Sequence, residues 1–155
     1  MIDYLIIGNG IAGVCFAELA LQGNKSILVF DNASQPSSRI AGGLYNPVVL
    51  KRFSEIWKAK EQVELVDSFY PELEKTLGTT FDYKLPIYRK FASIEEQNNW
   101  FQAADKPSLS DFLNTNLYNL GFSNINASFG FGEVYKTGYL DIKAMVEAYS
   151  DYLKA

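Results

Sequence analysis

A glycine-rich turn between an apolar strand and a helix constrains this chain more than any other feature. The turn, Gly8–Gly13, has the pattern G-x-G-x-x-G and lies between the apolar stretch Met1–Ile7 and the helix-forming stretch Val14–Leu21. The first glycine permits a tight turn, the second lets the backbone approach a phosphate, and the third lets the helix pack closely on the strand. The pattern therefore predicts that a pyrophosphate binds at the helix N-terminus, where unpaired N–H groups favour negative charge.

A second strand supports this prediction. Ser26–Phe30 is apolar and ends at Asp31, whose spacing from Gly13 is close to the roughly 20 residues expected for the acid that holds a ribose hydroxyl. An acid at this position argues against NADP, because it would repel the extra phosphate, but it suits FAD and NAD equally. The alternative is a glycine-rich turn in an unrelated α/β fold, with Asp31 as an ordinary turn residue.

Composition excludes several classes of function. The chain has 155 residues, a net charge of −4 and no histidine, so neither a Ser-His-Asp or Cys-His site nor a histidine-ligated metal site is expected within it. The acidic balance disfavours nucleic acid as a partner. The single cysteine, Cys15, is expected to be a small core residue. Its lack of a partner fits a reducing cytoplasm, and neither a signal peptide nor a membrane span is expected.

The middle of the chain has weaker signals. Ser54 is expected to cap a helix that Pro71 ends or kinks. A strand is expected over Phe81–Phe91, with Pro86 at an edge or bulge. Ser93 begins the capping-box sequence Ser-Ile-Glu-Glu, which predicts a helix reaching about Ala104.

The last part of the chain returns to a helix. Phe129–Leu140 is strand-like, and Asp141 is expected to cap a final helix with one apolar face. The whole pattern predicts an α/β chain, in which a Rossmann-type βαβ unit is interleaved with part of an antiparallel α+β domain. The expected divisions are a dinucleotide-binding part, connecting helices, a partial substrate domain, and a helix returning to the first part, over residues 1–53, 54–80, 81–139 and 140–155.

The predicted sheet has too few strands. Only two good parallel strands are found, whereas a dinucleotide fold needs at least three, and a two-stranded sheet leaves its edges unpaired and its apolar faces under-covered. We therefore expect the chain to be the truncated N-terminal part of a longer protein.

Three segments resemble one family. They are Ile6–Gly13 together with Asp31, the small-residue loop Ser37–Pro47, and Thr137–Asp141. The chain resembles the FAD-dependent oxidoreductases of the D-amino-acid oxidase type, which include glycine oxidase, sarcosine oxidase and D-amino-acid dehydrogenases. Many members carry Glu where this chain has Asp31.

The resemblance implies that the cofactor is FAD and that the full protein oxidises an amine or amino acid by hydride transfer to flavin N5. The implied cofactor-binding residues are Gly8, Asn9, Gly10, Ile11, Ala12, Gly13, Asp31, Asn32, Ser38, Arg39, Ala41, Gly42, Gly43 and Leu44. No catalytic residue or metal ligand is implied. The arginine that binds the substrate carboxylate in relatives is expected beyond Ala155, so the isolated chain is expected to be inactive.

The sequence is also compatible with other functions. The chain could be a non-catalytic dinucleotide-binding module or remnant, or part of an NAD-dependent dehydrogenase. Arg39 could face the pyrophosphate or be a solvated loop residue. Lys51 and Arg52 suit an anion, although surface charge is the simpler reading, and Tyr135 and Tyr139 suit either a substrate pocket or packing.

Overall fold

The chain folds as two compact units built from segments distant in sequence. The computed structural model describes residues 1–32, 37–119, 121 and 124–154. Unit 1 comprises Met1–Gly43, Ser68–Asp82 and Leu140–Ala155, whereas unit 2 comprises Leu44–Asp67 and Tyr83–Tyr139.

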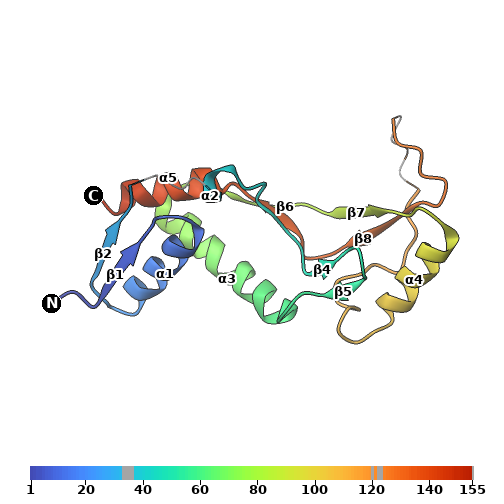
Figure 1. Cartoon of the computed structure of the whole chain (residues 1–155), viewed down its shortest axis with the longest axis horizontal. Helices are drawn as coiled ribbons and strands as arrows, with labels where there is room; N and C mark the ends of the chain where they lie inside the picture. Colours follow the sequence, from blue (N-terminus) through green and yellow to red (C-terminus); the bar gives the residue numbers. More distant parts are fainter. Residues whose placement is uncertain (33–36, 120, 122–123, 155) are drawn as a thin grey trace. The chain divides into compact units, whose positions relative to one another are not determined.

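Unit 1 begins with a βαβ arrangement. The strands β1 (Tyr4–Ile7) and β2 (Ile27–Phe30) run parallel and are joined by α1 (Ile11–Gln22), as Figure 1 shows. Together with the helices and the antiparallel strands described below, this arrangement makes the fold a mixed α/β one, and it confirms the α/β class expected from the sequence.

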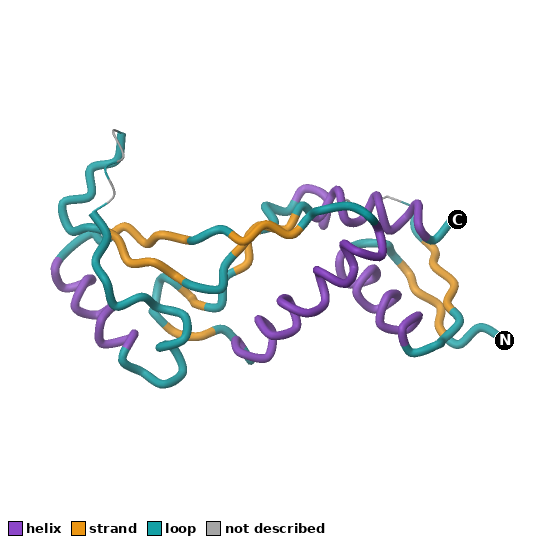
Figure 2. Tube along the Cα trace, turned by 180° about the vertical axis from the view of Figure 1, so that it is seen from behind, coloured by secondary structure: helices purple, strands orange, loops and turns teal. Residues whose placement is uncertain are grey.

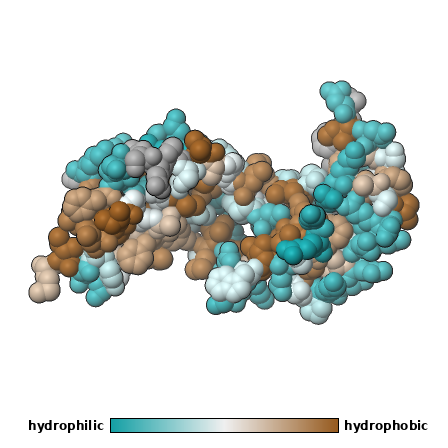
Figure 3. All heavy atoms as spheres, viewed as in Figure 1, coloured by the Kyte–Doolittle hydropathy of each residue, from teal (hydrophilic) through white to brown (hydrophobic). Residues whose placement is uncertain are grey.

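The sheet of unit 1 has two strands among the described residues, and one of its faces is apolar and exposed. Ile6 faces α1 and is buried. The alternate positions of both strands point the other way and are exposed, and Figure 3 shows hydrophobic side chains gathered over this end of the unit; they are Leu5, Ile7, Leu28 and Phe30. The under-covered face expected from the sequence is therefore present.

Two further helices complete this part of unit 1. The short helix α2 (Ser37–Ile40) packs against α5 (Ile142–Tyr152), which also packs against α1. Asp141 caps α5, as predicted, because its carboxylate accepts the Ala144 N–H at 3.0 Å. The buried face of α5 consists of Ile142, Met145, Val146 and Tyr149.

Unit 2 is mainly antiparallel. The strands that lie wholly or mostly in it form a three-stranded sheet in the order β3-β9-β6 and the pairs β4-β5 and β7-β8, and Figure 2 traces the strands in orange. Their bounds are β3 (Leu44–Tyr45), β4 (Val48–Val49), β5 (Ser54–Glu55), β6 (Asp82–Lys84), β7 (Ile87–Lys90), β8 (Phe131–Val134) and β9 (Gly138–Leu140).

Aromatic side chains fill the core of unit 2. Trp100 on α4 (Ile94–Ala104) is fully buried and meets Phe53 and Phe91 edge to face, with ring centroids 5.5 Å apart in each pair. The indole N–H of Trp100 donates to the carbonyl oxygen of Asn114 at 2.9 Å, so its polar atom is satisfied.

One local prediction was wrong. Ser54 does not cap a helix: it lies in β5, paired with Val49, and the following helix α3 begins at Ala59 (Ala59–Leu77). Of the two outcomes expected at Pro71, an end or a kink, the structure excludes an end, because the helix continues through Pro71 to Leu77. Pro71 is exposed, so the hydrogen bond that a proline cannot make is lost on the solvent side of the helix. The expected strand over 81–91 is interrupted at Pro86 and forms β6 and β7.

Candidate functional site

The glycine turn has the close packing that its sequence predicts. Gly8 has φ of +96°, a conformation that L side chains rarely adopt, and its N–H donates to the Phe30 carbonyl oxygen at 2.7 Å. A Cβ atom on Gly13 would lie 2.1 Å from the carbonyl oxygen of Gly8. Glycine at these two positions therefore lets α1 start directly against the end of β1.

The N-terminus of α1 is held by a serine from elsewhere in the chain. Gly10 occupies the N-cap position and has no side chain with which to cap the helix. Ser38 on α2 takes this role, because its hydroxyl oxygen accepts the Ile11 N–H at 3.2 Å. A Cβ atom on Gly10 would lie 2.8 Å from that same oxygen, so the glycine makes room for the serine.

Asn9 is buried within the turn and is fixed by α5. Its amide nitrogen Nδ2 donates to Ser150 Oγ at 2.7 Å, and the Ser150 hydroxyl donates to the Val146 carbonyl oxygen, also at 2.7 Å. The other polar atom of the side chain, Oδ1, is buried and has no hydrogen-bond partner among the residues that the structure describes. Asn9 therefore presents one unsatisfied acceptor at the glycine turn.

A pocket of about 760 Å³ lies over the turn. It brings together the turn, the end of β2 and the start of α2, and a second pocket of about 470 Å³ between β2 and α5 shares Asn9, Asp31 and Arg39 with it. The residues lining the larger pocket are Ile7, Gly8, Asn9, Gly10, Ile11, Ala12, Gly13, Phe30, Asp31, Asn32, Ser37, Ser38 and Arg39.

Most of the sequence-predicted site residues line this one pocket. The exceptions are the four residues Ala41–Leu44, which are not among its lining; Leu44 lies in β3, and Gly43 accepts the Leu140 N–H at 2.9 Å. Sequence reasoning missed Ile7, Phe30 and Ser37. Each is a direct neighbour of a predicted site residue, so a signal for them was available.

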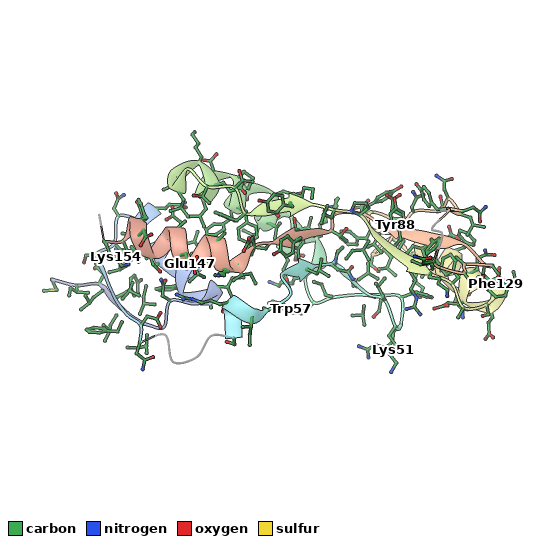
Figure 4. The ribbon with its side chains drawn as sticks, turned by 90° about the horizontal axis from the view of Figure 1, so that it is seen from above. Lys51, Trp57, Tyr88, Phe129, Glu147 and Lys154 are labelled. Atoms are coloured by element: carbon green, nitrogen blue, oxygen red, sulfur yellow. The ribbon has the colours of Figure 1, made fainter. Side chains whose placement is uncertain are left out.

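The remaining sequence candidates are not among the residues that line this pocket. Cys15 on α1 is partly buried, and its desolvation raises the pKa of the thiol, as expected of a packing residue. Lys51 and Arg52 are exposed on the β4–β5 turn, and Figure 4 shows Lys51 projecting from it. Tyr139 stacks on Tyr83 with ring centroids 6.1 Å apart.

The arrangement suits an anion with hydroxyl groups attached. The start of a helix carries partial positive charge and orphan N–H groups, and Arg39 adds a full positive charge beside it. Asp31 supplies a carboxylate acceptor in the same pocket. Within the described ranges, no three His, Cys, Asp or Glu side chains group as metal ligands, and no helix is long and apolar enough to cross a bilayer.

Two solved structures have the same fold. A glycine oxidase from Bacillus cereus ATCC 14579 matches with a TM-score of 0.70, at 17% identity, over 97% of this chain and 44% of its own. An L-amino acid deaminase from Proteus vulgaris matches with a TM-score of 0.67, at 15% identity, over 99% of this chain and 38% of its own. No family model matches the sequence.

The chain therefore spans less than half the length of either protein. The resemblance to oxidoreductases of the D-amino-acid oxidase type, first drawn from three sequence segments, is confirmed at the level of the fold.

Proposed function

We propose that this chain is the FAD-binding portion of an oxidoreductase that oxidises a small amine or amino acid. The observation that carries the proposal is the pocket over the Gly8–Gly13 turn, which combines a helix N-terminus, Arg39 and Asp31 in one cavity. The shared fold with a glycine oxidase and an L-amino acid deaminase supports the same substrate class.

The pocket residues fit the ADP part of FAD. The start of α1 would receive the pyrophosphate. Ser38 accepts the Ile11 N–H, which leaves the hydroxyl hydrogen of Ser38 available for a phosphate oxygen. Arg39 would balance the phosphate charge, and Asp31, with Asn32 beside it, would accept hydrogen bonds from the ribose hydroxyls. The unsatisfied Oδ1 atom of Asn9 is a buried acceptor that a ligand donor would satisfy.

The chemistry belongs to the cofactor. A bound flavin supplies N5 as the acceptor of the hydride that leaves the carbon bearing the substrate amine. The residues of this chain would bind and orient the cofactor. The proposal extends the binding surface to Ala41–Leu44, where one alanine and two glycines would allow backbone groups to approach the flavin. No described residue is given a catalytic role, and no metal is required.

Two other functions are distinguishable from this one. A non-catalytic dinucleotide-binding module is one, since the pocket over the Gly8–Gly13 turn would hold a dinucleotide whether or not the protein catalyses a reaction. An NAD-dependent dehydrogenase is the other, because Asp31 would hold the ribose of NAD as well as that of FAD.

Titration of the chain with FAD and with NAD separates the dinucleotides. We expect FAD to bind more tightly, and Asp31→Asn to weaken its binding about tenfold, because a hydrogen bond to a charged group contributes about 1.5–3 kcal/mol. Asp111→Asn is the matched control, since Asp111 is an exposed carboxylate in unit 2. Tighter binding of NAD, or equal effects of both substitutions, would contradict the proposal.

Flavin reduction separates an enzyme from a binding module. The FAD-loaded protein, extended to any further segment that its gene encodes, is mixed anaerobically with glycine and with D- and L-amino acids. Bleaching of the oxidised flavin band by one of them supports the oxidoreductase. FAD binding without bleaching by any amino acid or simple amine supports the module.

A further inference from the structure

A polar and aromatic cluster occupies one face of the β7–β8 sheet in unit 2. Tyr88 on β7 is paired directly opposite Glu133 on β8, so the two side chains share a face. The neighbouring Gly132 points the other way, because a Cβ atom there would lie 2.4 Å from Trp100. Tyr88, which is labelled in Figure 4, and Glu133 therefore lie on the side of the sheet away from the Trp100 core.

A third segment brings two more side chains to this face. Residues 113–118 run along β8 through the bridges Leu113↔Val134 and Tyr118↔Phe131. Tyr118 meets Tyr88 edge to face with ring centroids 5.7 Å apart. Asn114 is buried, and its amide nitrogen Nδ2 donates to Glu133 Oε2 at 2.9 Å and to the Tyr118 hydroxyl oxygen at 2.6 Å.

Glu133 is at the centre of this cluster and is held by neutral groups. The Tyr88 hydroxyl donates to its Oε1 atom at 3.3 Å, opposite the Asn114 contact with Oε2. A hydrogen bond with Glu133, together with partial burial and the Glu133 charge, raises the pKa of Tyr118 to about 12. Burial and the same carboxylate raise the pKa of Tyr88. Both phenols therefore remain neutral at physiological pH.

No described cation neutralises Glu133. Arg89, the nearest arginine along β7, points to the opposite face and is paired with Glu96. Lys136, three residues after Glu133, places its ammonium 5.4 Å from the centre of the Phe112 ring. The half-buried Glu133 carboxylate thus lies beside two aromatic rings and lacks an ion-pair partner in the described part of the chain.

We propose that the cluster of Tyr88, Asn114, Tyr118 and Glu133 binds the alkylammonium group of a small amine. A carboxylate attracts a cation, and the faces of aromatic rings attract it further, most strongly for ammonium groups that bear methyl substituents. Asn114 and the Tyr88 hydroxyl fix the carboxylate before the cation arrives, which lowers the ordering required on binding. The inference rests on this cluster alone and is independent of the proposed nucleotide binding.

The first test uses tetramethylammonium chloride as the probe on the full chain at low ionic strength. Its neutral counterpart is tert-butanol, which has a similar size and no charge. We expect saturable NMR shifts of the Tyr88 and Tyr118 ring protons with tetramethylammonium and no saturable shift with tert-butanol. Equal responses to both probes, or no saturable response to the cation, would overturn the proposal and leave the cluster as a structural network.

Substitutions then assign the binding energy. Glu133→Gln keeps the side-chain shape and removes the charge, so we expect at least a tenfold loss of affinity for tetramethylammonium. Tyr118→Phe keeps the ring and is expected to change affinity less than threefold, whereas Tyr118→Leu removes the ring and is expected to weaken binding at least fivefold. Glu95→Gln on α4, which alters an exposed carboxylate, is the control for a general loss of negative charge. Equal losses of affinity in Glu133→Gln and Glu95→Gln would contradict a local site.

Discussion

At the scale of single residues, the glycine turn depends on a contact that closes from the far end of the chain. Asn9 donates to Ser150 across 141 residues of sequence, and the hydroxyl of Ser150 is itself fixed on α5. Without this contact, the buried Asn9 side chain would lose the one hydrogen bond that it makes to a described residue. Ser150 is therefore a positioning residue for the proposed dinucleotide site, because it acts on the turn through its hydrogen bond with Asn9.

The substitution Ser150→Ala tests this role. We expect it to weaken FAD binding about three- to tenfold, since a typical hydrogen bond contributes about 0.5–1.5 kcal/mol, while the circular dichroism spectrum stays the same. Ser128→Ala is the matched control, because the Ser128 hydroxyl donates to Asn126 in an exposed segment of unit 2. Unchanged FAD affinity in Ser150→Ala would show that Asn9 needs no anchor.

The glycine turn and the serine that anchors it differ in how far the sequence could predict them. Gly8 and Gly13 were predictable, because the positive φ of Gly8 and the close approach of Gly13 to the Gly8 carbonyl oxygen are local features. Gly10 was predictable only from the motif, since the side chain it makes room for is that of Ser38 on α2. Ser150 has no such local signal. Its role exists only because the chain returns to unit 1 after building unit 2.

At the scale of elements, the N-terminus of α4 is a capping device with an added ion pair. The Ser93 hydroxyl oxygen accepts the Glu96 N–H at 3.1 Å, and Glu96 Oε2 accepts the Ala92 N–H at 2.6 Å. Arg89 donates to Glu96 from β7. Burial of Glu96 raises its pKa, but these partners outweigh that effect and leave the pKa below its ordinary 4.5.

This lowered pKa predicts a pH dependence of stability. The contribution of ionised Glu96 is fully present above pH 4.5 and is lost as the pH falls through the lower pKa of the folded state. Glu96→Gln should therefore reduce the free energy of unfolding near neutral pH and flatten its fall below pH 4.5, as measured by urea unfolding across pH. Glu95→Gln, in the same helical turn, should leave that fall unchanged. A parallel fall in the wild type and Glu96→Gln would contradict the prediction.

Helix starts were predicted where a capping side chain acts locally. Ser93 and Asp141 each bond a backbone N–H three residues ahead, and both helices were anticipated. Ser54 has the same residue type before an apolar periodic stretch, yet cross-strand pairing with Val49 determines its conformation. Pro71 is tolerated in α3 because it lies on an exposed position. Tertiary pairing and solvent exposure were not visible in the local pattern.

At the scale of the whole molecule, the α/β class followed from the alternation of strand and helix patterns. The bounds of the segments that make up the two units could not be predicted from those patterns. Unit 1 combines three segments separated in the chain. Its sheet exposes Leu5, Ile7, Leu28 and Phe30 on one face. The division into a cofactor-binding part and a partial substrate domain remains a proposal, supported by the fold shared with two amino-acid-converting enzymes.

The most direct measurement is a pair of ¹⁵N-correlated NMR spectra of the chain, without and with saturating FAD. We predict that the largest backbone amide shifts occur at Gly10, Ile11, Gly13 and Ser38. ADP alone should reproduce these shifts, because the pyrophosphate is proposed to bind at the start of α1. Shifts concentrated in unit 2, or no saturable shifts at the glycine turn, would contradict the central claim.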